Sequence, residues 1–390
     1  MTVGRMQYIS SRLIHGGVDG DSRTGAVNVP IYQTSTYKQL RLGQHSGYEY
    51  SRTGNPTREA LERLIAELEH GRHGLAFASG MAAITAVLTL FKSGDKILIS
   101  SNVYGGTYRV LDKIFSNFGI NYEIVETENQ QIFEGKLTPD VKAVLVESPA
   151  NPLMTVTDIE KVSRAARRRG IITIVDNTFL SPYLQRPLDL GADIVLHSAT
   201  KYLSGHSDLV AGLIALSDDD LAERLYFIQN ATGGILQPFD SFLLIRGIKT
   251  LGVRLDRHQE NALFVADWLQ NNAGVARVYY PGLPDDPGYE VQRRQADGAG
   301  GMLSFELAGG FEHEAFVNSL SLITLGESLG GVESLICQPS SMTHASIPED
   351  IRRRVGITEK LLRLSVGIED KRDIAADLEQ ALERSKRAAA

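Results

Sequence analysis

Short apolar runs alternate with helical patterns along this 390-residue sequence, and this alternation restricts its fold more than any other feature. Residues 171–176 and 193–197 are almost unbroken apolar runs, which is typical of strands buried on both faces of a parallel sheet. The other segments follow the same order, with strands predicted at 75–77, 96–100 and 143–147 and helices at 81–91, 104–118 and 157–169. This β-α-β order predicts an α/β fold with a mainly parallel sheet that is covered by helices on both faces.

A chain of this length usually forms more than one hydrophobic core. We expect three parts: an N-terminal arm over 1–60, a large domain over 61–256 and a smaller C-terminal α/β domain over 257–390. The arm has many turn formers and little helical periodicity, so we expect it to lie across the body or a neighbouring subunit. In the C-terminal part we predict strands at 302–305 and 361–366 and a terminal helix over 373–389 whose Ala-rich end frays.

The composition excludes several classes of protein. With 43% hydrophobic and 22% charged residues and a net charge of −7, the chain is typical of a globular protein, not one that binds nucleic acid. Cys337 is its one cysteine, so we expect no intramolecular disulfide and no cysteine zinc cluster, which fits a reducing compartment, and we predict no metal ligands. The longest apolar stretch, 82–91, is too short to span a bilayer, and residues 1–20 do not have the pattern of a signal peptide. We therefore expect a cytoplasmic protein with no membrane contact.

Polar residues stand where the predicted strands end. Ser79, Glu147, Asp176 and Ser198 all fall at carboxyl ends, where ligands bind in parallel sheets. Glu147 leads to a turn, after which Thr157 and Glu160 form a capping box that starts the next helix.

Lys201 follows the last of these strands and lies 25 residues after Asp176. A lysine amine can form a Schiff base with an aldehyde, and a carboxylate beside a pyridine nitrogen keeps that nitrogen protonated. The pair suggests the cofactor pyridoxal 5′-phosphate (PLP), although either residue alone is more often solvated at a surface.

The Ser79-Gly80-Met81 segment opens a predicted helix, whose free N–H groups favour a phosphate. The hydroxyls of Ser198 and Thr200 could complete the phosphate site, while the alternative interpretation is a routine helix cap. The chain has no GxxxxGK[ST] motif and no GxGxxG after an early strand, which argues against ATP and dinucleotides.

Four further residues have the chemistry of a PLP site but also have simpler explanations. Arg52 could form paired hydrogen bonds with phosphate beside Tyr50, although both could lie in an exposed loop. Tyr104 could lie flat on a ring or be structural. Arg363 interrupts an apolar strand and suits a substrate α-carboxylate, unless it forms a structural ion pair. We assign no catalytic role to His197 or His206.

Five segments in order resemble the Cys/Met-metabolism family of PLP enzymes, the trans-sulfuration enzymes. They are Tyr50-Ser51-Arg52-Thr53-Gly54-Asn55-Pro56-Thr57, Ser79-Gly80-Met81-Ala82-Ala83, Val175-Asp176-Asn177-Thr178, His197-Ser198-Ala199-Thr200-Lys201-Tyr202 and Glu327-Ser328-Leu329-Gly330-Gly331. The resemblance implies an aspartate-aminotransferase-like fold (fold type I), with PLP in the large domain and a homotetramer of two catalytic dimers. It also implies a small sulfur amino acid as substrate.

The resemblance implies a role for each candidate residue. Lys201 carries PLP and moves the substrate Cα proton, Asp176 holds the pyridine nitrogen, and Tyr104 stacks on the ring and supplies a proton to the leaving group. The other cofactor residues would be Asn151 at the ring hydroxyl, Ser79, Gly80, Met81, Ser198 and Thr200 at the phosphate, and Tyr50 and Arg52 from the neighbouring subunit. The substrate residues would be Arg363, Ser328, Asn151, Glu327 and Arg109.

Within the family the sequence favours cystathionine γ-lyase, which releases cysteine, 2-oxobutanoate and ammonia. Glu327 and Arg109 resemble the pair that lines the distal pocket of γ-lyases, and an anion suits the distal ammonium of cystathionine. Methionine γ-lyases carry a cysteine where Gly106 stands here. Cystathionine γ-synthase, which shares Glu327, remains the first alternative, followed by β-lyase and methionine γ-lyase. A PLP-binding regulatory protein is the non-enzyme alternative.

Overall fold

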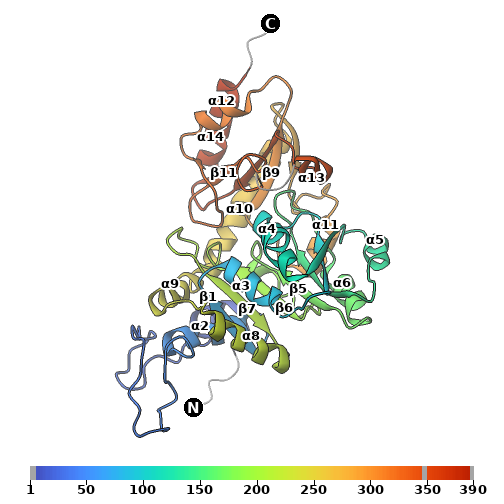
Figure 1. Cartoon of the computed structure of the whole chain (residues 1–390). Coiled ribbons are helices and arrows are strands. Elements are labelled where there is room, and N and C mark those ends of the chain that lie inside the picture. Colours follow the sequence, from blue (N-terminus) through green and yellow to red (C-terminus); the bar gives the residue numbers. More distant parts are fainter. Residues whose placement is uncertain (1–5, 345–348, 387–390) are drawn as a thin grey trace.

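Two sheets form the framework of the computed structural model, which describes residues 6–344 and 349–386 (Figure 1). The larger sheet has the strand order β1-β7-β6-β5-β4-β2-β3. Its strands are β1 (His73–Phe77), β2 (Lys96–Ser100), β3 (Asn121–Val125), β4 (Val141–Glu147), β5 (Ile172–Asp176), β6 (Ile194–Ser198) and β7 (Gly212–Leu216). Only β7 runs against its neighbours, so the prediction of a mainly parallel sheet is confirmed.

Helices cover both faces of this sheet, because its buried strands present apolar side chains alternately to each side. On one face, α3 (Gly80–Leu88), α4 (Gly105–Lys113) and α8 (Asp219–Thr232) pack on residues such as Ile174 and Leu196. On the other face lie α2 (Pro56–Leu68), α6 (Ile159–Arg167), α9 (Pro238–Ile248) and the start of α10 (Leu251–Gln270). Short segments complete this part: η1 (Phe115–Phe118), α5 (Gln130–Gly135) and α7 (Ser181–Leu184).

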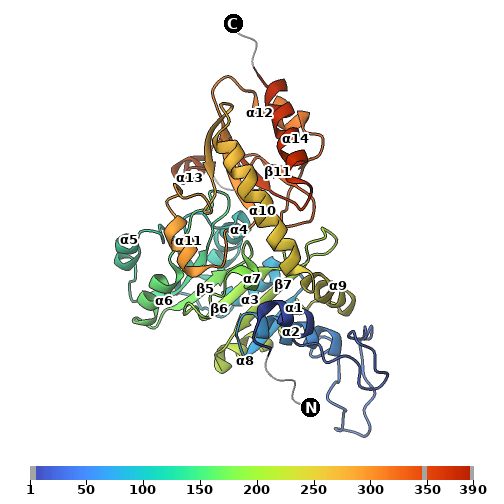
Figure 2. The same ribbon diagram turned by 180° about the vertical axis from the view of Figure 1, so that it is seen from behind.

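The second sheet has five strands in the order β10-β11-β12-β9-β8. They are β8 (Val275–Tyr279), β9 (Met302–Leu307), β10 (Thr324–Leu325), β11 (Leu335–Cys337) and β12 (Leu361–Ser365). Its core packs against α10 and against α12 (His313–Ser319) and α14 (Lys371–Arg384), while α11 (Tyr289–Gln295) and α13 (Glu349–Arg354) complete this part. Figure 2 shows α10 running from the larger sheet to the smaller one.

The helix α1 (Ile9–His15), which was not predicted from the sequence, packs against α2 and α10. Much of the chain between α1 and α2 projects from the body of the molecule in both views (Figures 1 and 2). Many side chains between Arg23 and Glu49 are exposed, including those of Leu40 and Leu42. The division at 60 and 256 stays a prediction, and its second boundary falls inside α10.

Some predicted helix ends differ from the structure. Asp158, not Thr157, caps α6, because its side chain accepts the Lys161 N–H while the Thr157 hydroxyl bonds to Thr127. The helix predicted to end at Phe118 is α4 followed by η1. The Ala-rich end of the predicted terminal helix falls partly at 387–390, outside the described residues, so its fraying stays a prediction. Among those residues, no helix is both long and apolar enough to cross a membrane.

Candidate active site

A cavity of about 290 Å³ lies at the carboxyl ends of β4, β5 and β6, facing the N-terminal end of α3. Most of the predicted site residues line it: Ser79, Gly80, Met81, Tyr104, Asn151, Asp176, Ser198, Thr200, Lys201, Glu327, Ser328 and Arg363. The first sheet and its loops supply the residues up to Lys201, and the region of the second sheet supplies Glu327, Ser328 and Arg363. The site therefore lies between the two halves of the chain.

Lys201 enters the cavity from the turn that follows β6. Its Nζ donates a hydrogen bond to Ser328 Oγ at 2.8 Å. Burial and the positive charge of Arg363 lower the pKa of Lys201 to about 8. A larger fraction of this amine is therefore neutral near pH 7 than for an exposed lysine, and the neutral amine is the nucleophile that attacks an aldehyde.

Asp176 ends β5 with one carboxylate oxygen engaged and the other available. Its Oδ1 accepts the N–H of Thr178 at 3.0 Å and also the Thr178 hydroxyl. Burial raises the pKa of Asp176, and both bonds from Thr178 oppose this rise. The described residues provide no hydrogen-bond partner for Oδ2, so this oxygen can accept a proton donor in the cavity, such as a pyridinium nitrogen. Thr178 had no predicted role. The sequence feature that could have indicated one is a threonine two positions after the aspartate.

Arg363 carries a buried charge that forms no contact ion pair among the described residues. It is 3% exposed, and its guanidinium donates to Asn151 Oδ1 at 2.8 Å and to the Ser328 carbonyl at 3.0 Å. Among the described residues, no carboxylate lies within 4.0 Å of it, so the alternative of a structural ion pair is wrong for this part of the chain. A buried cation of this kind suits a ligand carboxylate.

The N-terminus of α3 lies against the end of β6. Ser79 Oγ caps the helix by accepting the Ala82 N–H at 3.0 Å. A Cβ at Gly80 would lie 2.9 Å from Ser198 Cβ, so only glycine permits this close approach. The Thr200 hydroxyl is shared with the backbone of Ala211, at 3.0 Å from its N and 3.2 Å from its O. The helix end and these hydroxyls form a site for a small anion.

Tyr104 stands at the entrance to α4 with its side chain 38% exposed. Its backbone N–H donates to Glu147 Oε2 at 2.8 Å. A Cβ at Gly106 would lie 2.4 Å from Tyr104 Cε1 and 2.8 Å from Met81 Sδ, so the ring rests closely over this glycine. Glu147 and Thr343 also line the cavity, and neither had a predicted role.

Three predicted residues do not line the cavity of their own chain. Arg52 donates to the Asn230 carbonyl at 2.6 Å and lies 5.5 Å from the centre of the Tyr50 ring, beside a separate hollow. Arg109 is exposed on α4. Among the described residues of one chain, the lysine and arginine that line the cavity are thus Lys201 and Arg363.

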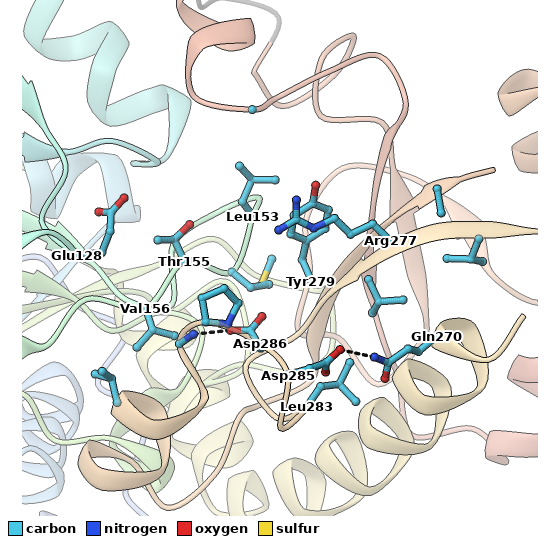
Figure 3. A pocket seen from close by; sticks show the side chains of 18 residues that line it. Glu128, Leu153, Thr155, Val156, Gln270, Arg277, Tyr279, Leu283, Asp285 and Asp286 are labelled. Carbon is cyan, nitrogen blue, oxygen red and sulfur yellow. Dashed lines mark hydrogen bonds between the residues drawn. The ribbon is translucent and has the colours of Figure 1, made fainter. Parts of the chain in front are cut away.

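A larger cavity of about 690 Å³ lies between β8 and the loop of Leu153–Val156 (Figure 3). Arg277, Glu128, Asp285 and Asp286 contribute its charges. None of the predicted site residues lines it, and it contains no lysine. The candidate chemistry is therefore concentrated in the smaller cavity.

The smaller cavity fits PLP. A lysine with a lowered pKa, a carboxylate with an available oxygen and an anion site at a helix N-terminus are the groups that hold its aldehyde, its pyridine nitrogen and its phosphate. The fold and this set of side chains define a PLP-dependent enzyme.

Comparison with known proteins gives the family. Residues 10–383 match the family described as Cys/Met metabolism PLP-dependent enzyme. The chain is 54% identical to cystathionine gamma-lyase of Bacillus subtilis (strain 168), over 95% of this chain and 98% of that protein. It is 52% identical to cystathionine beta-lyase of Lactococcus lactis subsp. cremoris (strain MG1363), over 97% and 100%. A solved structure of cystathionine gamma-lyase from Lactobacillus plantarum complexed with L-serine has a TM-score of 0.95 and 48% identity, covering 97% of this chain and 99% of that chain. The chain belongs to the Cys/Met metabolism PLP-dependent enzyme family.

Proposed function

We propose that this enzyme catalyses γ-elimination from L-cystathionine, giving cysteine, 2-oxobutanoate and ammonia. One observation carries the proposal: the cavity of Lys201 is also lined by a buried cation, Arg363, and by an exposed anion, Glu327. Arg363 would bind the α-carboxylate of cystathionine, and Glu327, at the mouth, would attract its distal ammonium. The named activity of the relative from Bacillus subtilis supports the same choice.

Each residue of the cavity has a defined task in this proposal. When bound, PLP withdraws electrons from the substrate Cα and so makes its proton acidic. Lys201 holds the cofactor and later moves the Cα proton, for which its lowered pKa is suited. A second proton must then leave the substrate Cβ before the γ-sulfur departs. Asp176 Oδ2 accepts the hydrogen bond of the ring nitrogen and so keeps a proton there. Tyr104 covers the ring and donates a proton to the leaving sulfur.

Asn151 connects cofactor and substrate in the proposal. Its Oδ1 accepts from Arg363, which leaves its amide N–H groups available to the ring hydroxyl. Gly80, Met81, Ser79, Ser198 and Thr200 would bind the phosphate. Arg109 would reach the distal end of the substrate from α4.

We infer an assembly of catalytic dimers paired into a homotetramer in the cytoplasm. The projecting N-terminal segment and the position of Tyr50 and Arg52 outside their own cavity support shared sites, since the phosphate otherwise lacks an arginine. The division into an arm at 1–60 and domains at 61–256 and 257–390 belongs to the same proposal. One buried, unpaired cysteine, Cys337, is compatible with a reducing compartment.

The decisive experiment supplies the purified, PLP-loaded protein with L-cystathionine alone and identifies the 2-oxo acid. Mainly 2-oxobutanoate with cysteine supports γ-elimination. Mainly pyruvate with homocysteine would replace it with β-elimination, the second candidate because a 52% identical relative is named cystathionine beta-lyase. No product from cystathionine, together with its formation from an acylhomoserine and cysteine, would assign the γ-synthase reaction.

A further inference from the structure

Glu147 is a buried carboxylate that lines the candidate active site. It is the last residue of β4 and 4% exposed, and its own N–H donates to Ser100 Oγ at 3.2 Å. Burial costs an ionised carboxylate several kcal/mol unless hydrogen bonds replace its water, so each bond that it accepts is informative.

Each of its two oxygens accepts a backbone N–H from a different loop of the site. Oε2 accepts from Tyr104 at 2.8 Å, and Oε1 accepts from Asn151 at 3.0 Å. Tyr104 is the N-cap residue of α4, and Asn151 belongs to the turn after β4. One side chain therefore joins the backbone positions of two candidate cofactor residues.

The connection continues to the substrate side. Asn151 Oδ1 accepts from Arg363, Arg363 donates to the Ser328 carbonyl, and Ser328 Oγ accepts from Lys201. These contacts form an unbroken hydrogen-bonded path from Tyr104 through Glu147 to Lys201. Displacing the Glu147 carboxylate would therefore move both the ring cover and the carboxylate receptor.

Glu147 also faces Asp176 across the sheet. The two residues are paired in register on the parallel strands β4 and β5. Burial and the neighbouring Asp176 raise the pKa of Glu147, whereas the two N–H donors and Arg363 lower it. Two neighbouring buried carboxylates repel each other when both are ionised. A cation in the cavity, such as a protonated pyridine, would stabilise the ionised form of both.

We propose that Glu147 is a positioning residue, whose carboxylate sets the placement of Tyr104 and Asn151 and thereby the affinity of the site for PLP. This inference rests on the proposed roles of Tyr104 and Asn151. It is independent of which sulfur amino acid is the substrate.

The test titrates PLP into apoprotein, followed by absorbance, for wild type and Glu147→Gln. The amide keeps the shape of the side chain but replaces one acceptor oxygen with an N–H donor, so one buried backbone N–H loses its partner. We expect the Kd for PLP to rise roughly tenfold. In a Tyr104→Ala background the same substitution should raise the Kd less, because only the part of its effect that acts through Asn151 remains.

Asp377→Asn is the matched control. Asp377 is also a buried carboxylate that accepts backbone N–H groups, from Ser321, Leu322 and Ile323, but it lies outside the cavity. It should lower the melting temperature without changing the Kd for PLP. If Glu147→Gln is not folded, Glu147→Asp, which moves the carboxylate by one methylene, is measured in the same two backgrounds.

Two results would overturn the inference: an unchanged Kd for PLP in a folded Glu147 variant, or the same fold-change with and without the Tyr104 ring. The titration uses no substrate. A failure of the cystathionine assay would therefore leave this test intact, and the reverse also holds.

Discussion

Lys201 Nζ and Ser328 Oγ lie 2.8 Å apart, so a hydrogen bond joins the lysine after β6 to a loop before β11. Ser328→Ala removes the acceptor but keeps the Ser328 carbonyl, which Arg363 still contacts. We expect kcat/KM to fall about tenfold with PLP still bound, because one hydrogen bond to a charged group is lost. Steady-state kinetics check this, with Ser341→Ala, a change at an exposed serine, as the control. A wild-type kcat/KM in Ser328→Ala would contradict the prediction.

The pKa of Lys201 makes reconstitution dependent on pH. Because only the neutral amine attacks the PLP aldehyde, the rate of PLP incorporation into apoprotein should rise with pH through about 8 and then level off. Arg363→Ala removes a neighbouring like charge, so the midpoint should move upward towards the ordinary lysine value. Stopped-flow absorbance at a series of pH values measures both midpoints. Equal midpoints would show that Arg363 does not act on the lysine.

Arg363→Lys keeps the charge but loses the planar pair of donors that contact Asn151 and Ser328. We expect KM for every amino-acid substrate to rise at least about tenfold, since a lysine binds a carboxylate less well in this geometry. Arg372→Lys, at an exposed ion pair with Asp370, is the control that should leave KM unchanged. An unaltered KM in Arg363→Lys would remove the carboxylate role.

Gly106→Ala should displace the ring of Tyr104. The added Cβ would lie 2.4 Å from Tyr104 Cε1 and 2.8 Å from Met81 Sδ, well inside van der Waals contact. We expect weaker PLP binding and a fall in kcat of about tenfold or more, because small displacements of catalytic groups cause losses of this size. Gly135→Ala, at a helix position with open space, is the control. Wild-type PLP affinity and kcat in Gly106→Ala would contradict a role for the position of the Tyr104 ring in binding PLP or in catalysis.

Mixing inactive subunits tests whether Arg52 acts across a dimer. Lys201→Ala should abolish turnover and the visible band of bound PLP, and Arg52→Ala should lose most activity. A mixed dimer has one site with both native residues, so activity should return on subunit exchange. Lys201→Ala with Asp176→Ala is the control, because both residues line one cavity and no mixed site is intact. No recovery after proven exchange would refute the shared site.

The positions of the strands and their carboxyl ends could be predicted from the sequence, because buried parallel strands are nearly continuous apolar runs. Ser79, Glu147, Asp176 and Ser198 were expected at one edge of the sheet, and all four line the cavity. Periodicity carries no information on strand order, so the insertion of β7 between β1 and β6 could not be derived.

The remaining contacts depend on the three-dimensional arrangement of distant segments. The bonds from Glu147 to two loop N–H groups have no sequence pattern, since any carboxylate at a strand end could be solvated. The cap of α6 was misplaced by one residue because Thr157 and Asp158 are both good caps, and Thr157 bonds instead to Thr127. The helix α1 is too short for its periodicity to be distinctive.

The helix α10 extends for 20 residues without a break from the larger sheet to the smaller one (Figure 2). Lys201 belongs to one side of this connection, and Arg363 and Ser328 belong to the other. Asn261, in the middle of this helix, donates to the Gly367 carbonyl at 2.9 Å, just after β12. A tilt of α10 relative to the larger sheet would therefore carry β12 with it and shift the Arg363 guanidinium relative to Lys201. The fit of the substrate thus depends on a helix whose residues do not line the cavity.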